Sequence, residues 1–123
     1  MAWTVRNHDD FDPEFDTLPV EVQDELLAMT ALLEVYGPGL GRPHADTLAG
    51  SKHANMKELR FTLPDGEWRI AFAFDPQRQA ILLVGGSKSG TGEKQFYRDL
   101  IRVADARFSA HLKSLPPKGG GKR

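Results

Sequence analysis

The chain has 123 residues, of which 40% are hydrophobic and 27% charged, so it is long enough for one core and too apolar to stay disordered. It contains no cysteine, which excludes disulfide bonds, thiolate metal sites and a cysteine nucleophile. No apolar run approaches the roughly 20 residues that cross a bilayer, and the start shows no basic segment followed by an apolar one. We therefore expect a cytoplasmic protein without membrane contact.

Charge is divided unevenly along the chain. Residues 1–50 hold two Lys and Arg against ten Asp and Glu, a balance of −8, whereas residues 51–123 hold fourteen against seven, a balance of +7. A polyanion, if one binds, would therefore meet the second half. The alternative is a charge segregation that only tunes solubility.

The N-terminal part predicts a short strand, then helices, then a loop. Residues 3–7 alternate as in a strand, Asp12-Pro13-Glu14-Phe15 is typical of a helix start, and a second helix starts at Thr17-Leu18-Pro19. Gly37-Pro38-Gly39 ends that helix, and residues 37–55 are expected to be a connecting loop. The apolar positions of the second helix predict a buried stripe that consists of Val22, Leu26, Met29 and Leu33, widened by Leu27, Leu32 and Tyr36.

A hairpin is predicted around Asp65-Gly66, which is a typical two-residue turn between alternating segments. That turn pairs Leu63 with Trp68 and places all apolar pairs on one face. Arg60 and Arg69 then share the opposite face in diagonal positions, away from the core. The neighbouring Ala71 and Ala73 would leave that face shallow, which offers a place for a phosphate.

The C-terminal part predicts a buried strand and a long helix. Residues 80–84 form a continuous apolar run, followed by a flexible basic loop over residues 85–92 and a helix that starts near Thr91. Its expected buried face consists of Phe96, Leu100, Val103, Ala104 and Phe108. Pro116-Pro117 ends the helix, so we expect one domain over residues 1–115 and a mobile basic tail over residues 116–123.

Several familiar chemistries lack their motifs. The loop at residues 85–92 does not have the spacing of a phosphate-binding loop, and no Gly-x-Ser-x-Gly motif occurs. The four histidines at positions 8, 44, 53 and 111 show no close metal-ligand pairing. We therefore expect no metal and no other cofactor.

Three segments resemble the RelE/HigB superfamily of toxins from type II toxin–antitoxin systems, most closely the phage-derived branch. They are residues 48–60, which include Glu58-Leu59-Arg60, residues 68–75, which start with Trp68-Arg69, and the strand at residues 81–83. The resemblance implies an α+β fold, with an antiparallel sheet packed against N-terminal helices and a C-terminal helix. It also implies cleavage of mRNA on the ribosome and neutralisation by a cognate antitoxin, expected to be a helix-turn-helix protein. Operator DNA would be bound only through the antitoxin complex.

Carried over by position, Arg60 and Arg69 match two arginines of the family, and Lys88 matches the first of two lysines after the last strand. The second of those lysines is Ser89 here, and neither Tyr97 nor His111 aligns clearly with the family's acid–base residue. The expected catalytic residues are Arg60, Arg69, Lys88 and Lys57, and the expected RNA-binding residues are Lys52, His53, Ser87 and Lys94.

Metal-independent RNA cleavage suits these residue types. The 2′-hydroxyl attacks the adjacent phosphorus, and two arginines can hold the nonbridging oxygens while Lys57, Lys88 or His53 transfers a proton. The alternative is that both arginines are strand residues paired with Glu58 and Glu67. At the level of function, the alternatives are a gyrase-poisoning toxin of the related ParE branch and a degenerate toxin that only binds its antitoxin or DNA.

Overall fold

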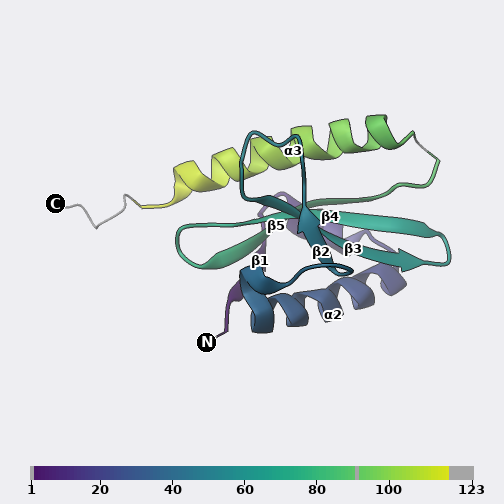
Figure 1. Ribbon diagram of the computed structural model, residues 1–123, viewed down its shortest axis with the longest axis horizontal. Coiled ribbons are helices and arrows are strands. Elements are labelled where there is room, and N and C mark those ends of the chain that lie inside the picture. The colour runs from purple at the N-terminus through teal and green to yellow at the C-terminus, as the bar shows by residue number, and fades with distance from the viewer. Residues whose placement is uncertain (1, 91, 117–123) are drawn as a thin grey trace.

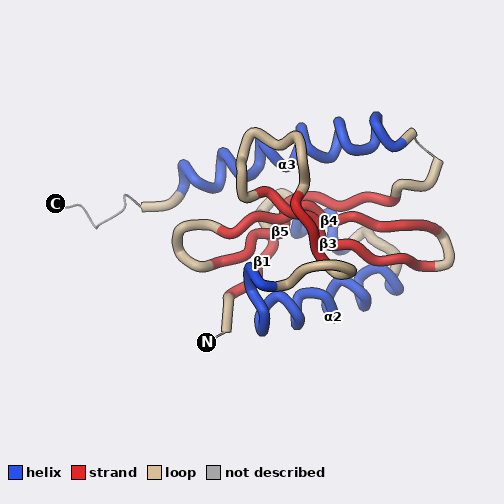
Figure 2. The backbone as a smooth tube through the Cα atoms, viewed as in Figure 1, coloured by secondary structure: helices blue, strands red, loops and turns tan. Residues whose placement is uncertain are grey.

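The computed structural model describes residues 2–90 and 92–116. In Figures 1 and 2 a central sheet lies between helices from the two ends of the chain. The elements in chain order are β1 (Thr4–Asn7), α1 (Phe11–Asp16), α2 (Val20–Tyr36), the 3₁₀ turn η1 (Gly37–Gly39), β2 (Ala45–Thr47), β3 (Met56–Leu63), β4 (Gly66–Phe74), β5 (Gln79–Ser87) and α3 (Glu93–Ser114).

The five strands form one sheet in the order β1-β5-β4-β3-β2. Neighbouring strands are antiparallel except β1, which pairs in parallel with β5. The predicted α+β class is confirmed, with a mixed sheet in place of a purely antiparallel one. A parallel pair needs a long connection between its two strands, and residues 8–78 separate β1 from β5.

Both faces of the sheet are covered, as the apolar run at residues 80–84 predicted for that strand, whereas the face that carries Arg60 and Arg69 was expected to be open. One core lies between the sheet and α1 and α2, and it is built around Leu26, Leu33, Leu59, Ile70 and Phe72. A second core lies between the sheet and α3, and it is built around Met56, Ala71, Leu83, Leu100 and Phe108. Ala71 and Ala73 are fully buried in it, so the face expected to be shallow and open is covered by a helix. The small alanine side chains allow α3 to pack close to the strands.

The β3–β4 hairpin has the predicted faces but a different register. Leu63 pairs with Gly66, Phe61 with Trp68, and Arg60 directly with Arg69, so the predicted Leu63–Trp68 pair and the diagonal placement of the arginines are wrong by two residues. The turn lies at Pro64-Asp65, where proline suits its first central position and glycine the position that follows. Gly66 has a φ of 142°, a value that side chains disfavour.

Further boundaries differ from the prediction. The expected loop over residues 37–55 contains η1 and β2, and β5 continues through Gly85 and Gly86 to Ser87 in place of a flexible loop. In α2 the four predicted core positions are buried, whereas Leu27 and Tyr36 are exposed. On α3, Val103 is half-buried and His111 completes the buried face.

α3 ends at Ser114, before the two prolines. Of the expected tail, only Pro116 belongs to the described residues, and the remaining positions lie outside them. Within the described part of the chain, no helix has the length and apolar character needed to cross a membrane.

Candidate functional site

Two arginines face each other across the central hairpin. Arg60 of β3 and Arg69 of β4 are a directly opposed pair, and both project from the face that α3 covers. Like charges directly opposite each other are unfavourable in a sheet, so other groups must offset them. The pairing with Glu58 and Glu67 that was considered from the sequence is confirmed: Arg60 binds Glu58 and Arg69 binds Glu67.

Arg69 is buried and fully engaged. Its side chain is only 3% exposed. Its Nε donates to the Tyr97 hydroxyl (3.1 Å), Nη1 to the carbonyl of Trp68 (2.8 Å) and Nη2 to Glu67 Oε1 (2.8 Å). Burial opposes the charged form of Arg69, but the hydrogen bonds to Tyr97 and Glu67 and the charge of Glu58 outweigh it and raise its pKa. Arg69 therefore organises its neighbours and offers no exposed donor.

Glu58 and Tyr97 join the two arginines into one network. The Tyr97 hydroxyl, which reaches the sheet from α3, donates to Glu58 Oε1 (2.9 Å), while Arg60 Nη1 donates to Glu58 Oε2 (2.7 Å). Glu58 Oε1 also lies 3.8 Å from Arg69 Nε. Burial of the Tyr97 hydroxyl and the nearby Glu58 charge raise its pKa, against the opposing hydrogen bond from Arg69. Tyr97 therefore stays protonated and acts as a donor.

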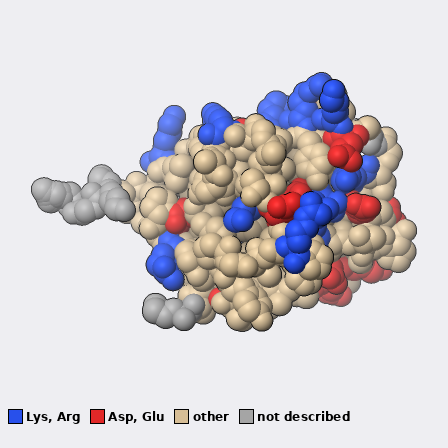
Figure 3. Space-filling view, viewed as in Figure 1, with Lys and Arg blue, Asp and Glu red and all other residues tan. Residues whose placement is uncertain are grey.

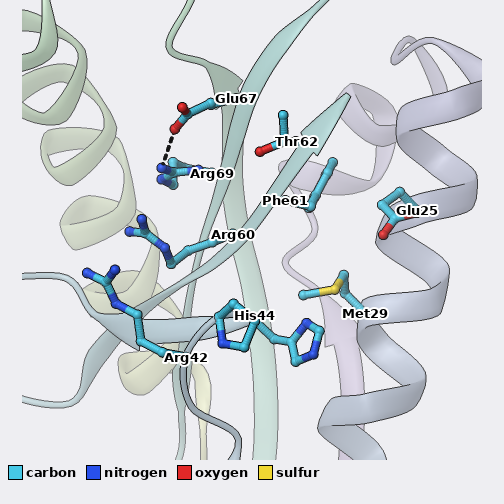
Figure 4. A pocket seen from close by; sticks show the side chains of 10 residues that line it. Glu25, Met29, Arg42, His44, Arg60, Phe61, Thr62, Glu67 and Arg69 are labelled. Atoms are coloured by element: carbon cyan, nitrogen blue, oxygen red, sulfur yellow. Dashed lines mark hydrogen bonds and ion pairs between the residues drawn. The ribbon is translucent and has the colours of Figure 1, made fainter. Parts of the chain in front are cut away.

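Arg60 lines a pocket that has a volume of about 550 Å³. The pocket lies at the outer edge of β3, where the pairing with β2 stops at Leu59 and the amide of Arg60 donates to the carbonyl of His44 (2.8 Å). In Figure 4 the guanidinium groups of Arg42, Arg60 and Arg69 point to the same side, and α2 supplies Met29 and Glu25 on the other side. The pocket thus combines cationic groups with an apolar wall.

Arg60 and Arg42 differ from Arg69 in what they can still bind. Among the described residues, Nη1 is the only nitrogen of the Arg60 side chain with a hydrogen-bond acceptor, so Nε and Nη2 can donate to a ligand. Arg42 is exposed and held by Asp46 through Nε (2.9 Å) and Nη2 (2.8 Å). An anion in the pocket would therefore be bound through these two arginines.

Lys88 lies beside the same network. Its amide donates to the carbonyl of Glu67 (2.8 Å), and its Nζ lies 3.8 Å from Glu67 Oε1 and 3.4 Å from Glu93 Oε1. The ammonium group is also 5.7 Å from the centre of the Tyr97 ring. The hydrogen bond from Arg69 and the charge of Lys88 lower the pKa of Glu67. The structure thus brings Arg60, Arg69 and Lys88 together as the sequence predicted.

The remaining predicted residues lie elsewhere. Side chains alternate along a strand, so Lys57, which is one position from Glu58, belongs to the opposite face of the sheet from Arg60. Ser87 pairs with Trp68 and likewise shares the opposite face. Lys57 is therefore not part of the arginine network. The sequence-based prediction placed it there because it is close to Arg60 in the chain, without considering that side chains alternate between the two faces of a strand. Lys94 is exposed on α3, one helical turn before Tyr97.

Lys52 and His53 are held against the middle of α3. The Lys52 amide donates to Asp105 Oδ2 (3.2 Å), and His53 Nε2 is 3.0 Å from the Ser109 hydroxyl. Asp105 follows Tyr97 by eight residues, which is about 12 Å along a helix. These two residues therefore lie on the same side of the sheet as the arginine network but further along α3.

Sequence reasoning missed Glu58, Tyr97 and Arg42 as members of the site. The spacing of Glu58 and Arg60 in one strand does indicate a shared face, so Glu58 could have been included. Tyr97 and Arg42 reach the site from segments whose placement depends on tertiary packing. Within residues 2–90 and 92–116, no group of three or more His, Asp or Glu is arranged to hold a metal ion.

Charges of both signs share the surface around this network. On the face shown in Figure 3, Lys and Arg gather along the upper rim, where α3 runs, and others lie next to Asp and Glu further down. On this face the cations are interspersed with carboxylates and do not form one continuous basic patch.

A family model and two named proteins match most of this chain. Residues 13–109 match the family model described as "Phage derived protein Gp49-like". A Mycobacterium tuberculosis H37Rv protein named "Putative toxin HigB2" is 47% identical over 93 residues, which are 75% of this chain and 46% of that protein. "Putative toxin HigB3" of the same strain is 52% identical over 91 residues, 73% of this chain and 75% of that protein. The chain thus spans less than half of the first relative and three quarters of the second.

A solved structure shares the architecture at low sequence identity. A mutant of the Escherichia coli toxin RelE in the free state aligns with a TM-score of 0.57 and 13% identity. The alignment covers 83% of this chain and 96% of that one. At this identity the likeness concerns the fold alone.

Proposed function

This chain belongs to the family of phage-derived Gp49-like proteins of the RelE/HigB type, and on that premise we propose that it is a toxin that cleaves mRNA on the ribosome without a metal ion. Its partners would be the ribosome, mRNA and a cognate helix-turn-helix antitoxin, with operator DNA bound only through the antitoxin complex. The site of action would be the cytoplasm.

The observation that carries the proposal is the position of Arg60. It lies at the wall of the pocket with two nitrogens able to donate, and the half-exposed carboxylate of Glu67 lines the same pocket beside Lys88. A guanidinium fork matches the nonbridging oxygens of a phosphate and offsets the charge that grows in the transition state. A phosphodiester in the pocket would thus meet a cation and a proton acceptor together.

The reaction we propose is a transesterification. The 2′-oxygen bonds to phosphorus as its proton passes to Glu67, which lines the pocket, and the bond from phosphorus to the 5′-oxygen breaks as Lys88 protonates the leaving oxygen. The products are a 2′,3′-cyclic phosphate and a 5′-hydroxyl. Tyr97 and Arg69 act as positioning residues, because they hold Glu58 and Glu67 and do not reach the pocket with an exposed donor.

The other predicted residues have roles outside the reaction. Lys94, Lys52 and His53 would bind RNA along α3. Lys57 and Ser87 belong to the other face, so the proposed catalytic set omits Lys57, and Ser87 would contact RNA only at the hairpin end.

The test is cleavage of mRNA by the purified chain with ribosomes in magnesium buffer, with and without a chelator selective for transition metals such as 1,10-phenanthroline. We expect cyclic-phosphate ends, no effect of the chelator, and a loss of about 100-fold or more for Arg60→Ala, which is typical when one preorganised donor is removed. Arg98→Ala is the matched control, because Arg98 is exposed on α3 and, among the residues that the structure describes, its side chain hydrogen-bonds only to Gln95. Cleavage by folded Arg60→Ala at the unchanged rate would refute the assignment.

One observation favours a second candidate, a toxin that binds its antitoxin without cleaving RNA. Both arginines of the hairpin are already paired with carboxylates, and every nitrogen of the Arg69 side chain has an acceptor. Absence of cleavage by the wild-type chain, together with tight antitoxin binding, would support this candidate.

A further inference from the structure

The outer face of α2 carries apolar side chains that nothing in the described structure covers. Val20, Leu27 and Val35 are 66%, 57% and 67% exposed. In Figure 1, α2 forms the lower boundary of the molecule, with the sheet on one side only. Single exposed apolar residues are ordinary, but several on one helix face indicate an interaction surface.

These residues form one continuous stripe. Positions 20, 24, 27, 31 and 35 are all exposed and are separated by four, three, four and four residues, a spacing that keeps them on one side of a helix. The buried positions 22, 26, 29 and 33 repeat in the same way on the opposite side. Three- and four-residue spacing is the pattern with which one helix packs against another. We call Val20, Leu27, Ala31 and Val35 the outer stripe.

The charges around the outer stripe have one sign. α2 contains four carboxylates and no Lys or Arg, and Glu21, Asp24 and Glu34 are exposed around the stripe. The whole segment from residue 7 to residue 41 has no Lys or Arg. A second copy of the chain docked through this face would bring carboxylates against carboxylates, and RNA would be repelled. The complementary partner has basic residues beside an apolar face.

We propose that the outer stripe is the docking surface for an amphipathic helix of the cognate antitoxin, with Lys and Arg flanking its apolar face. The proposal rests on the proposed toxin function, since that function requires an antitoxin. It assigns antitoxin binding to the face of α2 that points away from the sheet and from the arginine pocket.

The test uses the protein encoded by the reading frame adjoining this gene, purified alone and titrated into the chain. We expect slower amide exchange in residues 20–36 of the complex, and affinity at least about tenfold lower for Leu27→Asn combined with Val35→Asn, as burial of a leucine side chain implies. The matched control is Ala106→Asn combined with Ala110→Asn, two exposed positions on α3. Unchanged affinity of the stripe variant would overturn the proposal.

A second pair of variants tests the charge argument. Glu21→Lys combined with Glu34→Lys should weaken binding and make it less dependent on salt, whereas Asp99→Lys on α3 should not. If the chain alone is a dimer that the Leu27→Asn and Val35→Asn changes dissociate, a second copy occupies the stripe and the proposal fails. It also fails if no adjoining reading frame encodes a protein that binds the chain.

The two proposals can fail separately. The stripe lies outside the arginine network, so its variants should cleave mRNA at the wild-type rate when no antitoxin is present. Normal cleavage with undiminished antitoxin binding in the stripe variant would overturn only the docking proposal. Absent cleavage in the wild-type chain, with antitoxin binding lost in the stripe variant, would overturn only the nuclease.

Discussion

Replacing Arg69 should test whether this residue acts as a buried structural cation. Arg69→Met keeps the aliphatic stem but removes the charge that faces Glu58, whose side chain is only 5% exposed. Breaking a buried ion pair from one side typically costs about 3–5 kcal/mol. Glu58 keeps its bonds to Arg60 and Tyr97, and Glu67 is half exposed to water, so we expect a smaller cost of about 2–4 kcal/mol.

The expected loss of stability is large enough to measure by thermal or urea denaturation. For a domain of this size, about 1 kcal/mol shifts Tm by roughly 3–6 °C, so the midpoint should fall by roughly 6–24 °C. Arg98→Met, at an exposed position, should remain within about 0.5 kcal/mol of the wild type. The sequence placed Arg69 on an open face away from the core, where removal of its side chain would leave the fold intact, and the burial of this side chain reverses that expectation.

A double-mutant cycle isolates the cause. If the destabilisation comes from the uncompensated Glu58 charge, Glu58→Gln should rescue part of it, with a coupling energy above about 1 kcal/mol between Glu58→Gln and Arg69→Met. Strictly additive effects, or a stability of Arg69→Met equal to that of the Arg98→Met control, would refute the reasoning.

Three further outcomes follow from burial, close contacts and charge. Asp75 has a lowered pKa because hydrogen bonds from α3 and the β4–β5 turn outweigh its burial. The stability that Asp75 contributes to the fold is therefore complete above pH ~4 and is lost as the pH falls below that. Asp75→Asn should flatten this part of an acid denaturation profile. A methyl group at Gly85 would lie 2.5 Å from the buried Ile70 side chain, so Gly85→Ala should cost about 1–3 kcal/mol by chemical denaturation, whereas Gly41→Ala meets nothing within 4 Å and should not. Deleting residues 118–123 removes three cations, which should lower the log–log salt slope of RNA binding by at most about 2 in a salt titration; an unchanged slope would show that the tail does not contact RNA.

The hairpin shows what a local pattern can and cannot determine. Apolar alternation predicted the faces of β3 and β4 correctly, because a side chain's face depends only on odd or even position. The register depends on the turn, and Pro64-Asp65 forms it in place of Asp65-Gly66. The resulting shift is two residues, so every side chain keeps its predicted face of the sheet, and Arg60 and Arg69 lie on the same face as predicted.

The environment of the arginines could not be predicted in the same way. Alanines at positions 71 and 73 are compatible with an open surface and with a closely packed helix, and only the position of α3 decides between them. The same uncertainty hid Tyr97, which reaches Glu58 from α3 across a sequence separation of 39 residues. Leu27 was assigned to the core because it lies beside Leu26 in the apolar pattern of the helix. The stripe of α2 that packs on the sheet is narrower than predicted, and Leu27 lies outside it.

The positions of the outer stripe and the pocket constrain how an antitoxin could neutralise this protein. Met29 and Glu25 line the pocket from the inner side of α2, whereas Leu27 and Val35 point away from the sheet. A helix bound on the outer stripe would therefore leave Arg60 accessible to a short oligonucleotide while adding bulk beside it. We expect the antitoxin complex to bind a short RNA in solution with nearly the affinity of the toxin alone, yet to fail to cleave mRNA on ribosomes. Loss of short-RNA binding in the complex would instead show that the antitoxin also enters the pocket, because a helix bound only to the outer, acidic face of α2 does not cover Arg60.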